Sequence, residues 1–158
     1  MIHSDKKSGQ ALVETALVLL LLLIILLGIT EFARAWFVKN TLKHGAREGA
    51  RKAVVTPDIS NFVASCASQF DTCPNSEPAE ANDKVLFAVC CSAPGIKRDK
   101  TQVTLSITDN GNSLIPDKGD TVEVTSSFND SSFFIVGGSP WPWPSNLIFD
   151  VTARMRYE

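Results

Sequence analysis

The sequence has little of what most enzyme classes require. It contains two histidines, His3 and His44, and neither has a catalytic or metal-binding partner at a suitable spacing. Nucleophile-elbow, P-loop, dinucleotide-binding and zinc-protease motifs are absent from the sequence. The sequence therefore gives no positive indication of an enzyme, and we predict neither a cofactor nor a metal site.

An excess of charge is also missing. The chain carries 15 Lys and Arg against 17 Asp and Glu, a formal net charge of -2, so its charge does not indicate a nucleic-acid partner. Asp109, Asn110 and Asn112 loosely resemble a calcium loop. The terminal Glu of the twelve-residue calcium pattern is absent, so we interpret these residues as a turn.

Proline is absent before Pro57, which permits one long helix in the first third of the chain. Strong helix formers dominate this stretch. Because a residue before proline avoids the helical region, Thr56-Pro57 is predicted to end the helix. A stripe of small residues near its end would let a neighbouring element approach closely: Ala46, Gly49, Ala50 and Ala53.

One long apolar run is present, from Ala11 to Ile29. It is close to the roughly 20 residues that a helix needs to cross a bilayer core. Lys6 and Lys7 precede it, which favours a cytoplasmic N-terminus and an extracytoplasmic C-terminal domain. Trp36 and Phe37 are interpreted as interfacial and core-packing residues.

A cleaved secretory signal is the alternative for this run. Ala33-Arg34-Ala35 fits a small-x-small cleavage site, which would release a chain beginning at Trp36. The apolar core is longer than the usual ~7–15 residues of such signals, and the helical pattern continues through the site. We therefore favour a retained membrane helix.

The segment after Pro57 has the composition of a polar domain. Residues 57–69 are predicted to form a short helix, with Asp58 near its N-cap. Four runs are predicted to be strands: 85–91, 101–108, 121–128 and 147–157. The predicted fold class is α+β: a long N-terminal transmembrane-plus-extramembrane helix, then a short helix packed on an antiparallel sheet of about four strands.

Trp141 and Trp143 lie between three prolines, which cannot belong to a central strand. They either present aromatic rings to a partner or fold back over the edge of the sheet, and both interpretations remain open.

Four cysteines lie in the predicted outer domain, where disulfides persist: Cys66, Cys73, Cys90 and Cys91. Of the three pairings, the one that joins Cys90 to Cys91 requires a strained vicinal ring and is ranked last. The other two pairings stay open. Zinc is disfavoured because the spacing is C-x₆-C followed by an adjacent pair.

One carboxylate, Glu14, stands near the start of the apolar run. An unpaired carboxylate entering a bilayer costs up to a few kcal/mol on insertion scales. The stretch Lys6-Lys7-Ser8-Gly9-Gln10-Ala11-Leu12-Val13-Glu14 resembles the class III signal of type IV pilins and pseudopilins. Three segments further resemble the TadE-like family of the tight-adherence (Tad/Flp) pilus system: 9–17, 28–35 and 46–51, as does the ending, 153–158.

The resemblance implies a pilin-like structural protein. It implies that a prepilin peptidase cuts between Gly9 and Gln10 and that Glu14 pairs during subunit assembly. The implied organisation is a cytoplasmic leader (1–9), a transmembrane part (10–30), an extramembrane helix (31–56) and an extracytoplasmic domain (57–158).

The implied partners are membrane lipid, prepilin peptidase, the major Flp pilin, other minor pilins and the Tad secretion platform. The implied location is the bacterial cytoplasmic membrane, with incorporation into the pilus as an option. The alternative function is a membrane-anchored extracytoplasmic binding module that is never processed.

Overall fold

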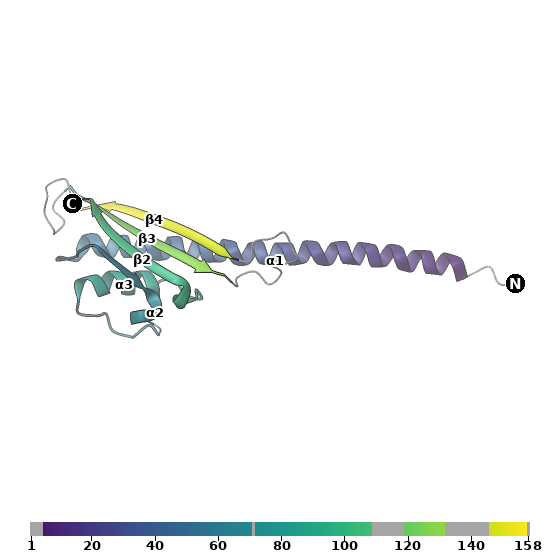
Figure 1. Ribbon diagram of the computed structural model, residues 1–158, viewed down its shortest axis with the longest axis horizontal. Coiled ribbons are helices and arrows are strands. Elements are labelled where there is room, and N and C mark those ends of the chain that lie inside the picture. Colours follow the sequence, from purple (N-terminus) through teal and green to yellow (C-terminus); the bar gives the residue numbers. More distant parts are fainter. Residues whose placement is uncertain (1–4, 71, 109–118, 132–145, 158) are drawn as a thin grey trace. The chain divides into compact units, whose positions relative to one another are not determined.

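The computed structural model describes residues 5–70, 72–108, 119–131 and 146–157 (Figure 1). The chain divides into two compact units, residues 1–36 and 37–158, and each is described by itself. The boundary falls within the first helix, α1 (Asp5–Val55).

Helix α1 ends directly before Thr56-Pro57, as predicted. The helix ends at Val55, and the Thr56 hydroxyl donates to the Lys52 carbonyl at 2.8 Å. Asp58 then takes a positive φ of 59°. No helix starts there, so the prediction that Asp58 caps a second helix was wrong: the residue instead makes the chain reverse after Pro57.

The second unit contains an antiparallel sheet of four strands in the order β1-β2-β3-β4. The strands are β1 (Phe62–Ser65), β2 (Thr101–Thr108), β3 (Thr121–Asp130) and β4 (Leu147–Arg156). Leu105 stands opposite Val124, which stands opposite Ala153. The strands predicted at 101–108, 121–128 and 147–157 are therefore confirmed to within two residues.

Side chains alternate between the two faces of this sheet. In β2 and β3 the buried apolar positions include Val103, Leu105, Val122 and Val124, as the alternation predicted. In β4, Ile148 is 54% exposed and Phe149 is partly buried, so Phe149 is the one of the two that points inward. One face of the sheet is thus covered and the other is open to solvent.

Two segments exchange their predicted roles. The helix predicted for residues 57–69 is wrong: these residues contain strand β1 and then the single turn α2 (Cys66–Gln69). The strand predicted for residues 85–91 is also wrong, because this apolar run belongs to helix α3 (Ala81–Cys91). A short apolar run buried on several sides gives no periodicity that separates helix from strand. The α+β class, with a short helix and four antiparallel strands, is confirmed, although the short helix and one strand come from different residues.

The core lies between the sheet, α3 and residues 37–55 of α1. The small stripe on α1 permits the close approach that the sequence predicted. A Cβ atom added at Gly49 would lie 2.2 Å from Val89 Cγ2 of α3, and one at Gly45 would lie 2.8 Å from the Val89 carbonyl oxygen. Any side chain at these two positions would force α1 and α3 apart.

Candidate processing and assembly site

The first unit is an apolar helical segment whose side chains are uncovered. From Leu12 to Ile29, the large apolar side chains are 45–72% exposed. Among the described residues, Gly9–Val55 is the one helix with an 18-residue window apolar enough to span a membrane. The mean hydropathy of that window is 3.0, and none of it is buried. Such an apolar surface is unfavourable in water and matches a bilayer core. The segment fits a single-pass membrane anchor.

The hydroxyls of this segment are satisfied locally. The Thr15 hydroxyl donates to the Ala11 carbonyl at 2.8 Å, and the Thr30 hydroxyl donates to the Leu27 carbonyl at 2.8 Å. Such bonds to the preceding turn allow a hydroxyl to enter an apolar environment. Thr15, directly after the carboxylate, is therefore compatible with a membrane helix.

Glu14 differs from these threonines. Its side chain is exposed, and within the described part of the chain it forms neither a hydrogen bond nor an ion pair. A carboxylate in this position needs a partner from outside the described residues if it enters an apolar environment. The structure thus places Glu14 where a second molecule could reach it.

Gly9 and Gln10 are also exposed and lie inside α1. A Cβ atom at Gly9 would meet no described atom within 4 Å, and the same holds for Gly28. Packing among the described residues therefore does not require glycine at either position.

Polar and aromatic residues follow the apolar run. Arg34 Nη1 lies 3.6 Å from Glu31 Oε2, and the rings of Phe32 and Trp36 stack with centroids 6.0 Å apart. Trp36 is 57% exposed. An exposed aromatic beside charged residues is the composition typical of a membrane–water interface, so the interfacial interpretation of Trp36 stays a prediction.

The four cysteines form two disulfides, Cys66–Cys90 and Cys73–Cys91, both of which tie the α2 region to α3. This is one of the two pairings that the sequence left open. The first disulfide is buried, whereas Cys73 and Cys91 are partly exposed. Cys90 and Cys91 occupy the last turn of α3 and not the end of the strand predicted over 85–91.

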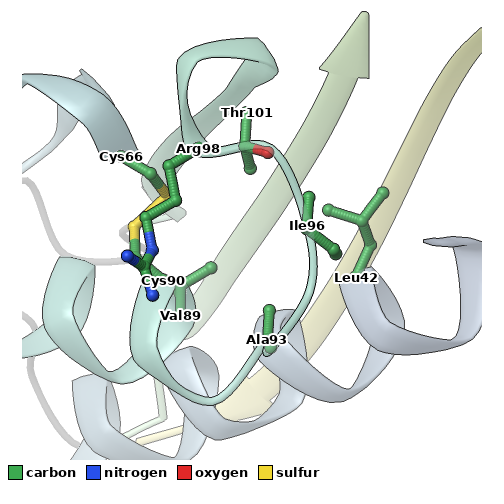
Figure 2. A pocket seen from close by; sticks show the side chains of 9 residues that line it. Leu42, Cys66, Val89, Cys90, Ala93, Ile96, Arg98 and Thr101 are labelled. Carbon is green, nitrogen blue, oxygen red and sulfur yellow. A yellow bond between two sulfur atoms is a disulfide. The ribbon is translucent and has the colours of Figure 1, made fainter. Parts of the chain in front are cut away.

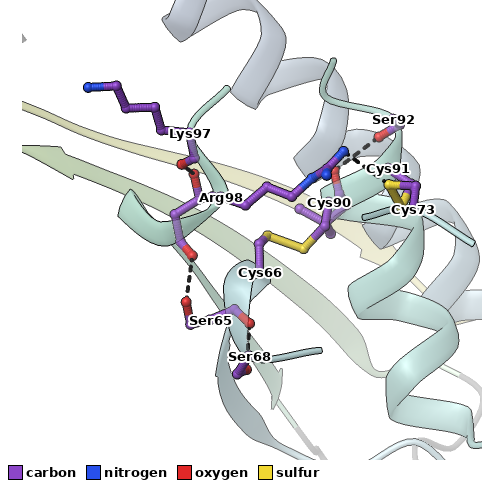
Figure 3. Close-up of a disulfide and its surroundings, with 11 residues drawn as sticks. Ser65, Cys66, Ser68, Cys73, Cys90, Cys91, Ser92, Lys97 and Arg98 are labelled. Carbon is purple, nitrogen blue, oxygen red and sulfur yellow. Dashed lines mark hydrogen bonds between the residues drawn. A yellow bond between two sulfur atoms is a disulfide. The ribbon is translucent and has the colours of Figure 1, made fainter. Parts of the chain in front are cut away.

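Arg98 joins the two disulfides, a role that sequence reasoning missed. Its side chain runs past Cys66–Cys90, and Nη2 donates to Cys73 Sγ at 3.2 Å (Figure 3). Sequence reasoning also missed an ion pair nearby. Asp130 is fully buried, and Lys97 Nζ lies 2.8 Å from its Oδ2. No sequence motif links these residues, because the loop before β2 brings them to the disulfides and to β3.

A small pocket lies between α1 and the buried disulfide (Figure 2). It is lined mainly by apolar side chains, with Arg98 and Thr101 as its polar residues. The space open to the centre of a water is about 10 Å³, room for one water at most. Among the described residues, no group of three His, Cys, Asp or Glu side chains is placed to hold a metal ion.

The two tryptophans predicted as partner contacts, Trp141 and Trp143, lie outside the described residues. The structure therefore does not test either interpretation of the proline-rich loop.

Comparison with known proteins bears on the N-terminal helix. The model of a family described as TadE-like protein matches residues 9–51, from the glycine of the candidate cut to the small stripe that packs on α3. No curated protein and no solved structure matches the chain. Residues 9–51 are therefore similar to the TadE-like family, which confirms the resemblance in the N-terminal sequence.

Proposed function

We propose that this chain is a minor pilin or pseudopilin of the Tad (Flp) pilus apparatus, a structural and assembly component with no catalytic role. The observation that carries this is the family match over residues 9–51, which include the uncovered apolar side chains from Leu12 to Ile29. The helix anchors the chain in the cytoplasmic membrane, with the second unit on the extracytoplasmic side. Its partners are then the major pilin, other minor pilins and the secretion platform.

In this proposal, prepilin peptidase hydrolyses the bond between Gly9 and Gln10. The leader leaves with a carboxylate on Gly9, and the mature chain begins with an α-amine on Gln10. Both residues are exposed, and Gly9 fills no packing role among the described residues. This supports a glycine that serves recognition by the peptidase.

Glu14 is proposed to pair with the α-amine of Gln10 on a neighbouring subunit. Its carboxylate has no partner within the described residues. Pairing lowers the free energy of a carboxylate among apolar helices. When subunits are out of register, the carboxylate is unpaired and this stabilisation is lost. The interaction thus favours one axial position of each subunit.

The first test is the intact mass of the protein purified from membranes of its native host, with and without prepilin peptidase. We expect the mass of residues 10–158 when the peptidase is present and that of residues 1–158 when it is absent. The mass of residues 1–158 in both strains would contradict processing and favour an unprocessed binding module. A chain starting at Trp36 would indicate a secreted domain.

Matched variants separate recognition from folding. Gly9→Leu should block cleavage, whereas Gly28→Leu should not, although both positions accept a side chain without contact to described atoms. Glu14→Gln should be processed and inserted normally but should co-purify less with the major pilin. Cleavage of Gly9→Leu at the wild-type rate would contradict the proposed role of Gly9 in peptidase recognition. Normal assembly of Glu14→Gln would contradict the proposed role of the Glu14 carboxylate.

A further inference from the structure

Residues 38–52 of α1 present two different flanks on either side of one buried stripe. The stripe, Val38, Leu42, Ala46 and Ala50, repeats every four residues and is at most 6% exposed. Residues at i and i+4 lie above one another on one side of a helix. Positions one residue before and one residue after the stripe therefore follow it on opposite sides.

The flank one residue before the stripe faces α3. Gly45 and Gly49 belong to it, and both approach Val89. This side of α1 is closed by packing at Gly45 and Gly49, whereas Phe37, at its start, is 53% exposed.

The flank one residue after the stripe is entirely basic. It consists of Lys39, Lys43, Arg47 and Arg51, and we call it the basic flank. All four side chains are exposed, and none forms an ion pair within the described part of the chain. At about 6 Å per four residues of helix, these cations form a row about 18 Å long. Four like charges at i, i+4 repel one another, so the row is unfavourable without an anionic partner.

The first cation of the basic flank lies beside β4. Lys39 Nζ stands 6.0 Å from the centre of the Phe149 ring. β4 is the last strand of the described sheet, so one of its edges lacks a strand partner among the described residues. Its inward side chains, Phe149, Val151, Ala153 and Met155, are only partly buried, unlike the fully covered Val122 and Val124. An apolar strip with a free backbone edge thus starts beside Lys39, the first cation of the row.

We infer that β4 and the basic flank together form a docking surface for an extended acidic segment of a partner protein. The segment adds to the edge of β4 as a fifth strand, and its alternate carboxylates face the basic flank. Side chains on one face of a strand repeat every ~6.6 Å, close to the ~6 Å repeat of the cations. Backbone pairing supplies affinity, and the charge row selects the sequence. This inference does not depend on cleavage at Gly9.

The test uses the full chain in uncharged detergent micelles and two fluorescent peptides. One alternates Glu with Val or Thr, and the other has the same composition with its glutamates in one block. We expect the alternating peptide to bind more tightly, with an affinity that falls as salt rises. Lys43→Gln with Arg47→Gln should weaken binding about tenfold, the effect of losing two exposed charge pairs. The matched control, Lys84→Gln with Lys100→Gln, removes the same charge elsewhere and should change it less than about twofold.

Three results would overturn the inference. Equal binding of both peptides would show that charge alone acts, without strand addition. Equal binding by the double variant and its control would remove the basic flank from the site. Binding of vesicles with anionic lipid that depends on Lys43 and Arg47, without binding of the alternating peptide, would assign the flank to a membrane surface instead.

Discussion

The two units of this chain handle apolar side chains in opposite ways. In residues 1–36, Leu20 is 56% exposed and every neighbouring leucine is similarly uncovered. In residues 37–158, Leu105 is 1% exposed and belongs to a core shared by helices and sheet. The same residue type therefore fits a bilayer in one unit and lies in a protein interior in the other.

The contrast extends to how each unit is held together. The apolar segment relies on helical backbone bonds alone, which are sufficient in a bilayer, where unpaired backbone groups are costly. The outer unit adds two disulfides, buried packing and ion pairs. Damage to the outer core should accordingly leave the membrane segment intact, and changes in the membrane segment should leave the outer core intact.

The largest expected effect comes from the buried disulfide. Replacing Cys66 and Cys90 with alanine should lower the free energy of unfolding of the second unit by about 4 kcal/mol, since it removes a cross-link and leaves space in the core. The Cys73 and Cys91 double variant should lose about 3 kcal/mol, because its sequence separation is 18 rather than 24 and its sulfurs are partly exposed. Urea unfolding of the full chain in micelles measures both, and a larger loss for the second pair would contradict this order.

The next effect compares two leucines. Leu105→Ala should destabilise the second unit by about 3 kcal/mol, the usual cost of a cavity in a packed core. Leu20→Ala should leave that free energy unchanged, because its side chain contributes nothing to the core. The same urea titration separates the two variants. A loss for Leu20→Ala similar to that for Leu105→Ala would show that the two units do not unfold independently.

The smallest of the three effects compares two glycines of α1. Gly49→Ala should cost about 2 kcal/mol, because the new methyl would lie 2.2 Å from Cγ2 of a β-branched side chain that moves little. Gly28→Ala should cause no loss, because nothing described lies within 4 Å and alanine favours the helix. Circular dichroism during thermal unfolding detects the difference. Unchanged stability for Gly49→Ala would mean that α3 can move away from α1 at little cost.

Much of the fold was predictable from local patterns. The alternation of Val103, Leu105, Val122 and Val124 predicted strands whose inner face is buried, and Thr56-Pro57 predicted the end of α1. The short runs 62–65 and 85–91 were assigned wrongly because their neighbours decide their structure. β1 forms where its backbone meets β2, and α3 is buried against α1 on one side and the sheet on another. Neither environment leaves a periodic signal in four to seven residues.

The candidate site divides in the same way. Gly9, Gln10 and Glu14 were recognisable from the sequence because they lie close together in it, next to a long apolar run. The basic flank was not recognised, although its four cations are evenly spaced in the sequence. Their importance depends on β4, which is about a hundred residues away in the chain and is brought beside α1 by folding.

The sequence by itself determined the apolar anchor, the TadE-like N-terminal helix, its end at Pro57 and three of the four strands. These features depend on hydropathy, backbone restriction and side-chain alternation, which act over a few neighbouring residues. The tertiary structure decided the pairing of the cysteines, the helical state of 81–91 and which flank of α1 stays open. Those choices depend on which distant segments pack together, because burial and cross-linking are set by neighbours in space rather than in sequence.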